Sequence, residues 1–283
     1  MTRSVLLASV LAVLVGCSVP VGASDASAPS GHAVYAVTRT TELGPNGSRS
    51  ESNAAVARFI RSEPEARALE LVGAALALPE VGACLQFGRA RLPVPSGPVE
   101  LADPGAVVVR VGDRDSTMTR RHLPDVADLV RGSVFTSNAA DLPAGERYEF
   151  RSAAGIAQGE APQDLAQLRV GDDELLDGMT VLVPRSSSTH GIDLTWSTTD
   201  AALAAGQASS LVYVDIAAKD GVLPTTRCTF EDRGRATLPV VAFDGMKEGL
   251  LSVHRVRREF RQQPSSELRF DFAVRASFHT LSR

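Results

Sequence analysis

The sequence predicts a mainly β protein built from short antiparallel strands. The clearest strand covers residues 268–278, where every even position is apolar and most odd positions are polar or charged. Alternation with a period of two places one face of a strand in a core and the other in water. Residues 192–197 repeat this pattern, and turn sequences rich in Gly, Asp and Pro separate the apolar runs. These observations together predict a β-sandwich.

A short helical insertion is expected after the first strand. Ser62-Glu63-Pro64-Glu65 has the form of a capping box, with a proline in the first turn, where it is tolerated. Leu69, Val72 and Leu76 then fall on one helical face. Because proline cannot continue a helix, Pro79 is expected to end it.

The other strands are expected where apolar and β-branched runs lie between turn residues. The last 105 residues hold six or seven such runs, which favours an antiparallel β-sandwich resembling an immunoglobulin-like module, although the Cys…Trp…Cys spacing of antibody domains is not matched. The expected strands cover 34–41, 83–90, 99–101, 106–112, 133–137, 147–152, 192–197, 211–216, 226–230, 251–256 and 268–278, with turns at 219–221, 232–234 and 263–265.

The N-terminal segment resembles the signal peptide of a bacterial lipoprotein. Arg3 supplies a positive charge, residues 5–15 are apolar, and Leu14-Val15-Gly16-Cys17 resembles a lipobox. The apolar run is about 11 residues long, whereas about 20 are needed to cross a bilayer as a helix. The resemblance implies that the peptide is cut before Cys17, that Cys17 is lipidated, and that the lipid anchors the protein to a membrane.

Four parts of the chain are expected from these patterns. Residues 1–16 are the signal peptide, and residues 17–32 are the lipidated cysteine and a flexible tether rich in Ser, Ala, Gly and Pro. Residues 33–178 form a β-rich domain with the helical insertion, and residues 179–283 form the β-sandwich domain. In the enteric sorting scheme an aspartate after the lipidated cysteine favours the inner membrane. Ser18 therefore indicates the outer membrane, facing the periplasm or the surface.

The charge of the chain argues against one class of partner, and its cysteines allow a disulfide. A formal net charge of −4 argues against nucleic acid, which requires a basic footprint. Besides Cys17 the chain holds Cys84 and Cys228, in a compartment that permits disulfides. The sequence leaves open whether these two pair or remain buried thiols, because separation along the chain says nothing about Cα distance.

No catalytic residue and no cofactor site are predicted. Ser186, Ser187 and Ser188 lie near His190 and Asp193, but no G-x-S-x-G turn lifts a serine into position. A solvated loop is the favoured interpretation of this serine run. No glycine-rich phosphate loop follows a strand.

No metal site is predicted either. Asp113-Arg114-Asp115 and Asp172-Asp173-Glu174 are acidic, but neither completes a calcium-binding loop. A calcium site assembled from separate loops stays open as an alternative. No zinc motif is formed by the five histidines, which are His32, His122, His190, His254 and His279.

Two further features have competing interpretations. Trp196 alternates with Ile192 and Leu194, so core packing is favoured over stacking on a sugar. The favoured interpretation of a run of arginines is a solvated strand face, and the alternative is a surface that contacts an anionic partner. These arginines are Arg255, Arg257, Arg258 and Arg261.

Several stretches resemble uncharacterised envelope lipoproteins of high-GC bacteria, which look like β-sandwiches on a lipid tether and bring no activity to transfer. These stretches are residues 227–234 followed by 237–239, and 111–113 with 123–126. We therefore expect a lipid-anchored cell-envelope protein with a binding or structural role and no catalysis. Its expected partners are the membrane, through Cys17, and an envelope protein or glycan. The alternatives are an envelope hydrolase of glycans, esters or peptides, and a calcium-dependent adhesion module.

Overall fold

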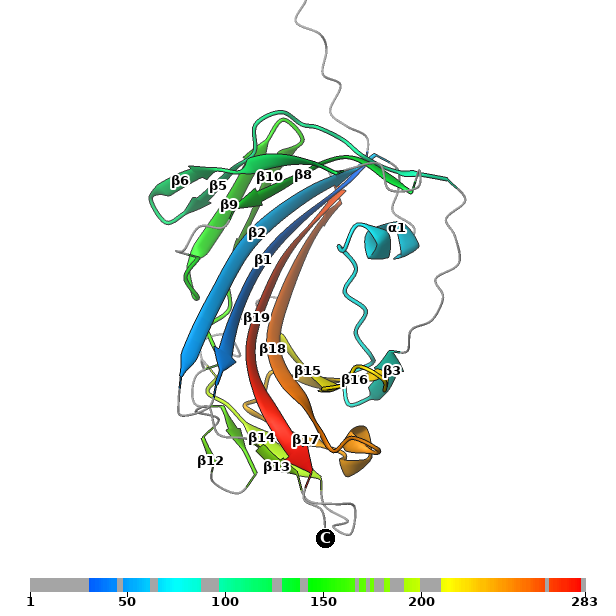
Figure 1. Ribbon diagram of the computed structural model, residues 1–283. Helices are drawn as coiled ribbons and strands as arrows, with labels where there is room; N and C mark the ends of the chain where they lie inside the picture. The colour runs from blue at the N-terminus through cyan, green and yellow to red at the C-terminus, as the bar shows by residue number, and fades with distance from the viewer. Residues whose placement is uncertain are drawn as a thin grey trace, which may run out of the picture.

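The computed structural model describes residues 31–44, 48–61, 66–87, 97–123, 129–137, 142–165, 168–171, 174–175, 181–183, 191–198, 210–262 and 265–280. Within these ranges the protein is mainly β, as predicted, with one large curved sheet and two small ones (Figure 1). The predicted signal peptide, Cys17 and nearly all of the tether lie outside them. No helix in the described ranges is long and apolar enough to span a membrane.

The large sheet has eleven strands, and one of them, β13 (Val181–Val183), pairs with β19 beside the main path. The main path runs in the order β3 (Cys84–Phe87), β16 (Thr225–Glu231), β15 (Leu211–Ala218), β18 (Glu248–Gln262), β19 (Ser265–Thr280), β1 (His32–Leu43), β2 (Arg49–Ile60), β4 (Val99–Leu101), β8 (Val130–Ser137) and β7 (Thr119–Leu123).

The centre of this sheet joins the first and last described strands of the chain. β1 runs parallel to β19, from Ala33 opposite Ser266 to Leu43 opposite Ala276, and antiparallel to β2. β18 and β19 form a long antiparallel hairpin. Strands from both sides of the predicted boundary at residue 178 therefore share one sheet.

Two four-stranded sheets pack on the convex side of the large sheet (Figure 1). The upper small sheet contains β10 (Gly155–Glu160), β9 (Arg147–Ser152), β5 (Val108–Val111) and β6 (Arg114–Thr117). The lower small sheet contains β12 (Glu174–Leu175), β11 (Arg169–Val170), β14 (Ile192–Thr195) and β17 (Arg235–Leu238), and the 3-10 helix η2 (Val240–Phe243) follows β17.

The even-numbered side chains of β19 contribute to two hydrophobic cores, one under each small sheet. Phe270 packs in the upper core with Phe150 of β9. Phe278 packs in the lower core with Leu194 and Trp196. Trp196 is only 5% exposed, which confirms its predicted place in the core. The period-two alternation of this strand thus supplies one apolar face to both cores.

The helical insertion is shorter than predicted. α1 covers Ala66–Leu71, and Gly73 follows it with a φ of 63°. The amide of Ala74 donates to the carbonyl of Leu69 at 2.7 Å, the closing bond expected when a left-handed glycine caps a helix. The prediction that Pro79 ends the helix was wrong, because Gly73 ends it earlier.

Gly132 in β8 lies where the parallel strands β4 and β8 approach each other closely. Gly132 has a φ of 119°, and an added Cβ would lie 2.1 Å from the carbonyl oxygen of Leu101 in β4. Gly132→Ala is expected to lower the free energy of unfolding by about 3 kcal/mol, because both the dihedral angle and a backbone contact oppose it.

Gly105→Ala is the matched control for this substitution. Gly105 also has a positive φ, of 80°, but an added Cβ would meet nothing within 4 Å. Its expected loss is about 1 kcal/mol, from the dihedral angle alone. Urea unfolding of both variants measures the difference, and equal losses would contradict the close β4–β8 contact.

Candidate functional site

Residues 72–87, here named the crossing segment, run over the concave face of the large sheet and end in the edge strand β3 (Figure 1). Near its start, Val72 and Ala74 are buried against Val34 of β1 and Ile60 of β2. Farther along, the segment passes over polar side chains that come from four neighbouring strands. These polar side chains are the candidate site.

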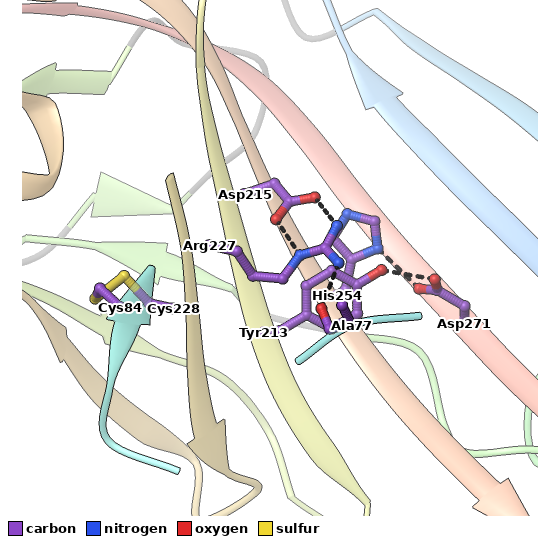
Figure 2. Close-up of polar contacts among 8 residues, drawn as sticks. All are labelled: Ala77, Cys84, Tyr213, Asp215, Arg227, Cys228, His254 and Asp271. Carbon is purple, nitrogen blue, oxygen red and sulfur yellow. Dashed lines mark hydrogen bonds and ion pairs between the residues drawn. A yellow bond between two sulfur atoms is a disulfide. The ribbon is translucent and has the colours of Figure 1, made fainter. Parts of the chain in front are cut away.

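A disulfide joins the end of the crossing segment to the sheet. Cys84 of β3 and Cys228 of β16 lie opposite each other in the strand pairing, with an S–S distance of 2.04 Å (Figure 2). Cys84 and Cys228 therefore pair with each other, which the sequence alone left open. The bond links positions 144 residues apart, and the chain-entropy model assigns about 5 kcal/mol to closing a loop of this length.

Two arginines of the sheet bind backbone carbonyls of the crossing segment. Arg269 of β19 is buried and donates to the carbonyl oxygen of Ala74 at 3.0 Å. Arg227 of β16 donates to the carbonyl oxygen of Ala77 at 2.8 Å. Asp215 of β15 orients Arg227 by accepting two hydrogen bonds of 2.7 Å (Figure 2). Paired, charge-assisted bonds of this kind fix the guanidinium plane, and with it the donor that reaches Ala77.

Asp271 of β19 is the centre of the polar network. Its Oδ1 lies 2.8 Å from Nδ1 of His254, and its Oδ2 accepts a hydrogen bond of 2.6 Å from the hydroxyl of Tyr213 (Figure 2). The rings of Tyr213 and His254 are stacked, with centroids 4.2 Å apart. The guanidinium carbon of Arg227 lies 4.7 Å from the centroid of the Tyr213 ring, which adds a cation–π contact.

The protonation states follow from this geometry. Burial raises the pKa of the Asp271 carboxyl, but the hydrogen bond and charge of His254, with the Tyr213 hydroxyl, outweigh it. The pKa of Asp271 therefore lies below its ordinary value. Burial, followed by the charge of Asp271, raises the pKa of Tyr213. At neutral pH the carboxylate is thus a charged acceptor and the phenol a donor.

The contacts of Asp271 link three neighbouring strands, because Tyr213 lies on β15, His254 on β18 and Asp271 on β19. The His254–Asp271 pair has the geometry of a base and its orienting carboxylate. A nucleophile would also have to bond to the other ring nitrogen, and no hydroxyl or thiol in the described ranges does so. Tyr213 already donates to Asp271, and its raised pKa opposes a phenolate role. The polar groups of Asp271 and Tyr213 are therefore used within the network.

The serine–histidine cluster considered from the sequence is only partly described. Ser186 to Ser188 and His190 lie outside the described ranges. Asp193 lies in β14, where it accepts a hydrogen bond of 2.6 Å from Thr237 of the adjacent strand β17. Its carboxylate thus links two strands of the lower small sheet.

In the described part of the chain, no group of three or more His, Cys, Asp or Glu residues could hold a metal ion. Asp115 accepts hydrogen bonds of 2.6 Å from both Arg110 and Arg151, which neutralise it. Asp172 and Asp173 lie outside the described ranges. His254 and His279 occupy paired strands, but the register places them opposite Ala273 and Glu248, so the two histidines do not meet.

The arginine run on β18 makes interior contacts. Arg255 is 3% exposed, pairs with Asp232 at 2.8 Å, and donates to three backbone carbonyls. Arg257 is buried and donates to the carbonyl oxygen of Glu160 at 2.9 Å. The prediction of a solvated strand face was therefore wrong for these two arginines. They bridge the large sheet to the segments that pack on it.

Of this network, His254 was considered from the sequence as a possible zinc ligand, but Tyr213 and Asp271 were not singled out as site residues. Tyr213 and Asp215 alternate with Val212, Val214 and Ile216, which face the lower core. This alternation assigns Tyr213 and Asp215 to the opposite face of β15. It does not show which side chains on other strands lie beside them, because that depends on the register of β18 and β19.

Comparisons with known proteins add little. No protein-family model and no curated protein matches the chain. Among solved structures, the chain is similar to the Fcho1 Mu homology domain of Danio rerio with bound Eps15 peptide, at 10% identity and a TM-score of 0.27. The match covers 89% of this chain and 99% of that chain. A likeness at this TM-score supports no statement about fold or function.

The lowered pKa of Asp271 predicts a pH dependence of stability. A carboxyl whose pKa is lower in the folded state stabilises the fold above its unfolded pKa of about 3.9, and this contribution is lost as the pH falls through the folded pKa. Asp271→Asn is expected to lower the free energy of unfolding at pH 7 by about 3 kcal/mol. It should also reduce the loss of stability between about pH 5 and pH 2.

Chemical unfolding across this pH range measures both effects. Asp220→Asn is the control, because Asp220 is exposed in a turn. Its Oδ1 accepts a hydrogen bond from the Val222 amide, and asparagine retains this oxygen. It should match the wild type to within about 0.5 kcal/mol. A pH profile of Asp271→Asn parallel to that of the wild type would show that Asp271 is not the titrating group.

Proposed function

We propose that this protein is a lipid-anchored component of a bacterial cell envelope whose β-rich body has a binding or structural role. The observation that carries the proposal is Cys17 at the end of a positive and apolar leader, in the sequence Leu14-Val15-Gly16-Cys17. Lipidation of Cys17 would hold the body at a membrane surface. Ser18 favours the outer membrane, facing the periplasm or the surface.

The disulfide supports an oxidising location for the body. Cys84 and Cys228 are bonded, and disulfides persist in the periplasm and at cell surfaces but are rare in the cytosol. The segment 17–32, rich in Ser, Ala, Gly and Pro, has a composition suited to a flexible tether. A tether of this length would give an average reach of about 20 Å.

The polar network supports a role without catalysis. Asp271 and Tyr213 are hydrogen-bonded to each other, and Arg227 is held between Asp215 and the crossing segment (Figure 2). Such a network stabilises a fixed surface, and a rigid body on a tether suits binding or scaffolding at the envelope. An envelope protein or a glycan is the partner we propose.

Fatty-acid labelling in cells tests the anchor. Full-length wild type should incorporate an alkyne fatty acid and remain in the membrane fraction after a high-salt wash, because the resemblance implies that the thiol of Cys17 carries a lipid and that its new N-terminus is acylated. Cys17→Ala should carry no label and keep its leader. Ser18→Ala is the matched control and should be labelled like the wild type, because it retains the thiol. Equal labelling of Cys17→Ala and wild type would contradict the proposal.

The same strains, crosslinked before lysis, test the binding role. An envelope partner should crosslink to the anchored wild type and to Ser18→Ala, and several-fold less to Cys17→Ala. Normal labelling at Cys17 without any crosslinked protein or glycan would leave the anchor in place and contradict the binding role.

A further inference from the structure

Arg58 of β2 is a half-buried side chain on the concave face of the large sheet, under the end of α1 (Figure 1). In the strand pairing it lies opposite Val34 of β1, whose other neighbour is Glu267 of β19. The Nε of Arg58 is fully buried and has no hydrogen-bond partner. A buried charged donor without an acceptor is unfavourable, and most such groups in proteins are paired.

Arg58 differs from the other arginines whose Nε is buried without a hydrogen bond. Within the described ranges, each of the others forms an ion pair with a carboxylate. These pairs are Arg39–Glu51, Arg151–Asp115, Arg255–Asp232 and Arg275–Glu42. No ion pair or hydrogen bond joins the side chain of Arg58 to another described residue. In this group of arginines, the charge of Arg58 is therefore the one without a countercharge.

The nearest charged neighbour of Arg58 is a second guanidinium. Burial, followed by the positive charge of Arg269, lowers the pKa of Arg58 to about 10, so Arg58 remains charged at neutral pH. The carboxylates on this face serve other groups. Glu267 lies 2.8 Å from Arg258 and 3.9 Å from Arg269, and Asp271 belongs to the polar network described above. One positive charge thus remains uncompensated, and it is that of Arg58.

The surroundings of Arg58 leave room for a small ligand to reach it. Gly73 is exposed, and a Cβ added there would lie 3.6 Å from Nη2 of Arg58. Because glycine has no side chain, residue 73 does not cover this nitrogen. The carbonyl of Ala74, next along the crossing segment, accepts from Arg269 at 3.0 Å. The guanidinium of Arg58 therefore faces solvent beside Gly73 while its Nε is shielded.

We infer that Arg58 binds the phosphate group of a small ligand beside Gly73, on the concave face of the large sheet. A guanidinium presents planar N–H donors that match the oxygens of a phosphate. The anion would supply the countercharge that Arg58 lacks, and the nearby charge of Arg269 would add to the attraction. Water could accept a hydrogen bond there but would supply no charge. The inference is independent of lipidation at Cys17.

Calorimetric titration of the purified chain with inorganic phosphate, at constant ionic strength, tests the inference. Phosphate should bind one site with a Kd of about 1 mM, as expected for a few charge-assisted hydrogen bonds. Arg58→Gln should weaken this binding by more than about tenfold, because it removes the charge. Arg49→Gln is the matched control. Arg49 is exposed at the other end of β2 and has no ion pair among the described residues, so its loss should leave the affinity unchanged.

Chemical unfolding of Arg58→Met tests the missing countercharge separately. Without phosphate, this variant should unfold at the same denaturant concentration as the wild type or a higher one, because an apolar side chain replaces an unpaired buried charge. Adding phosphate should raise the midpoint of the wild type more than that of Arg58→Met. General exclusion of phosphate from the protein surface acts on both, whereas specific binding stabilises only the wild type.

A second probe identifies the source of the phosphate group. Dihexanoyl-phosphatidylglycerol, below its micelle concentration, carries a phosphate with short acyl chains. Tighter binding than inorganic phosphate, lost in Arg58→Gln, would assign a lipid headgroup, and equal or weaker binding would assign a free phosphate.

Three results would overturn the inference. The first is no binding of phosphate at about ten times the expected Kd. The second is the same phosphate affinity in Arg58→Gln as in the wild type. The third is a lower unfolding midpoint of Arg58→Met without phosphate, which would show that the protein itself compensates the charge of Arg58.

Discussion

The parallel pairing of β1 with β19 is the constraint on which the rest of the architecture depends. It aligns Ala33 to Leu43 with Ser266 to Ala276 and so joins strands from the first and last parts of the chain into one sheet. β19 then supplies Phe270 to the upper core and Phe278 to the lower core. Each small sheet is too short to bury its own apolar face without the large one. β1 likewise supplies Val37 to the upper core and Leu43 to the lower core, so the paired strands β1 and β19 connect the two cores.

The two faces of the large sheet have different chemistry and different coverings. The convex face is mostly apolar and lies under the small sheets, with buried Arg255 and Arg257 bridging to the segments packed on it. The concave face carries Asp271, Tyr213 and Arg227 near the crossing segment. A short irregular segment buries little apolar area, so directional contacts must hold it. The Cys84–Cys228 bond and the two arginine–carbonyl contacts supply them. These three contacts fix the crossing segment to the sheet. The proposed envelope protein would therefore carry a rigid body at the end of its tether.

The sequence predicted those strands whose residue pattern can be recognised within the strand itself. The alternation of residues 268–278 identified β19, and 99–101 and 147–152 coincide with β4 and β9. β2 (Arg49–Ile60) was missed because Ser, Asn and Ala dominate its first part, residues with low strand propensity. Small side chains such as Ala55 and Ala57 fit there because they pack under the upper sheet. The Asp271 network could not be predicted, since its members lie on four strands whose register is set by long-range pairing.

Hydrogen exchange with mass spectrometry, measured across a denaturant series, tests most directly whether the shared sheet makes one cooperative unit. β9 reports on the upper core and β14 on the lower core. If the β1–β19 pairing joins the two cores, amides in both strands should become exposed at the same denaturant midpoint and with the same slope. Separate midpoints for the two strands would contradict the account, because each core would then unfold as an independent domain.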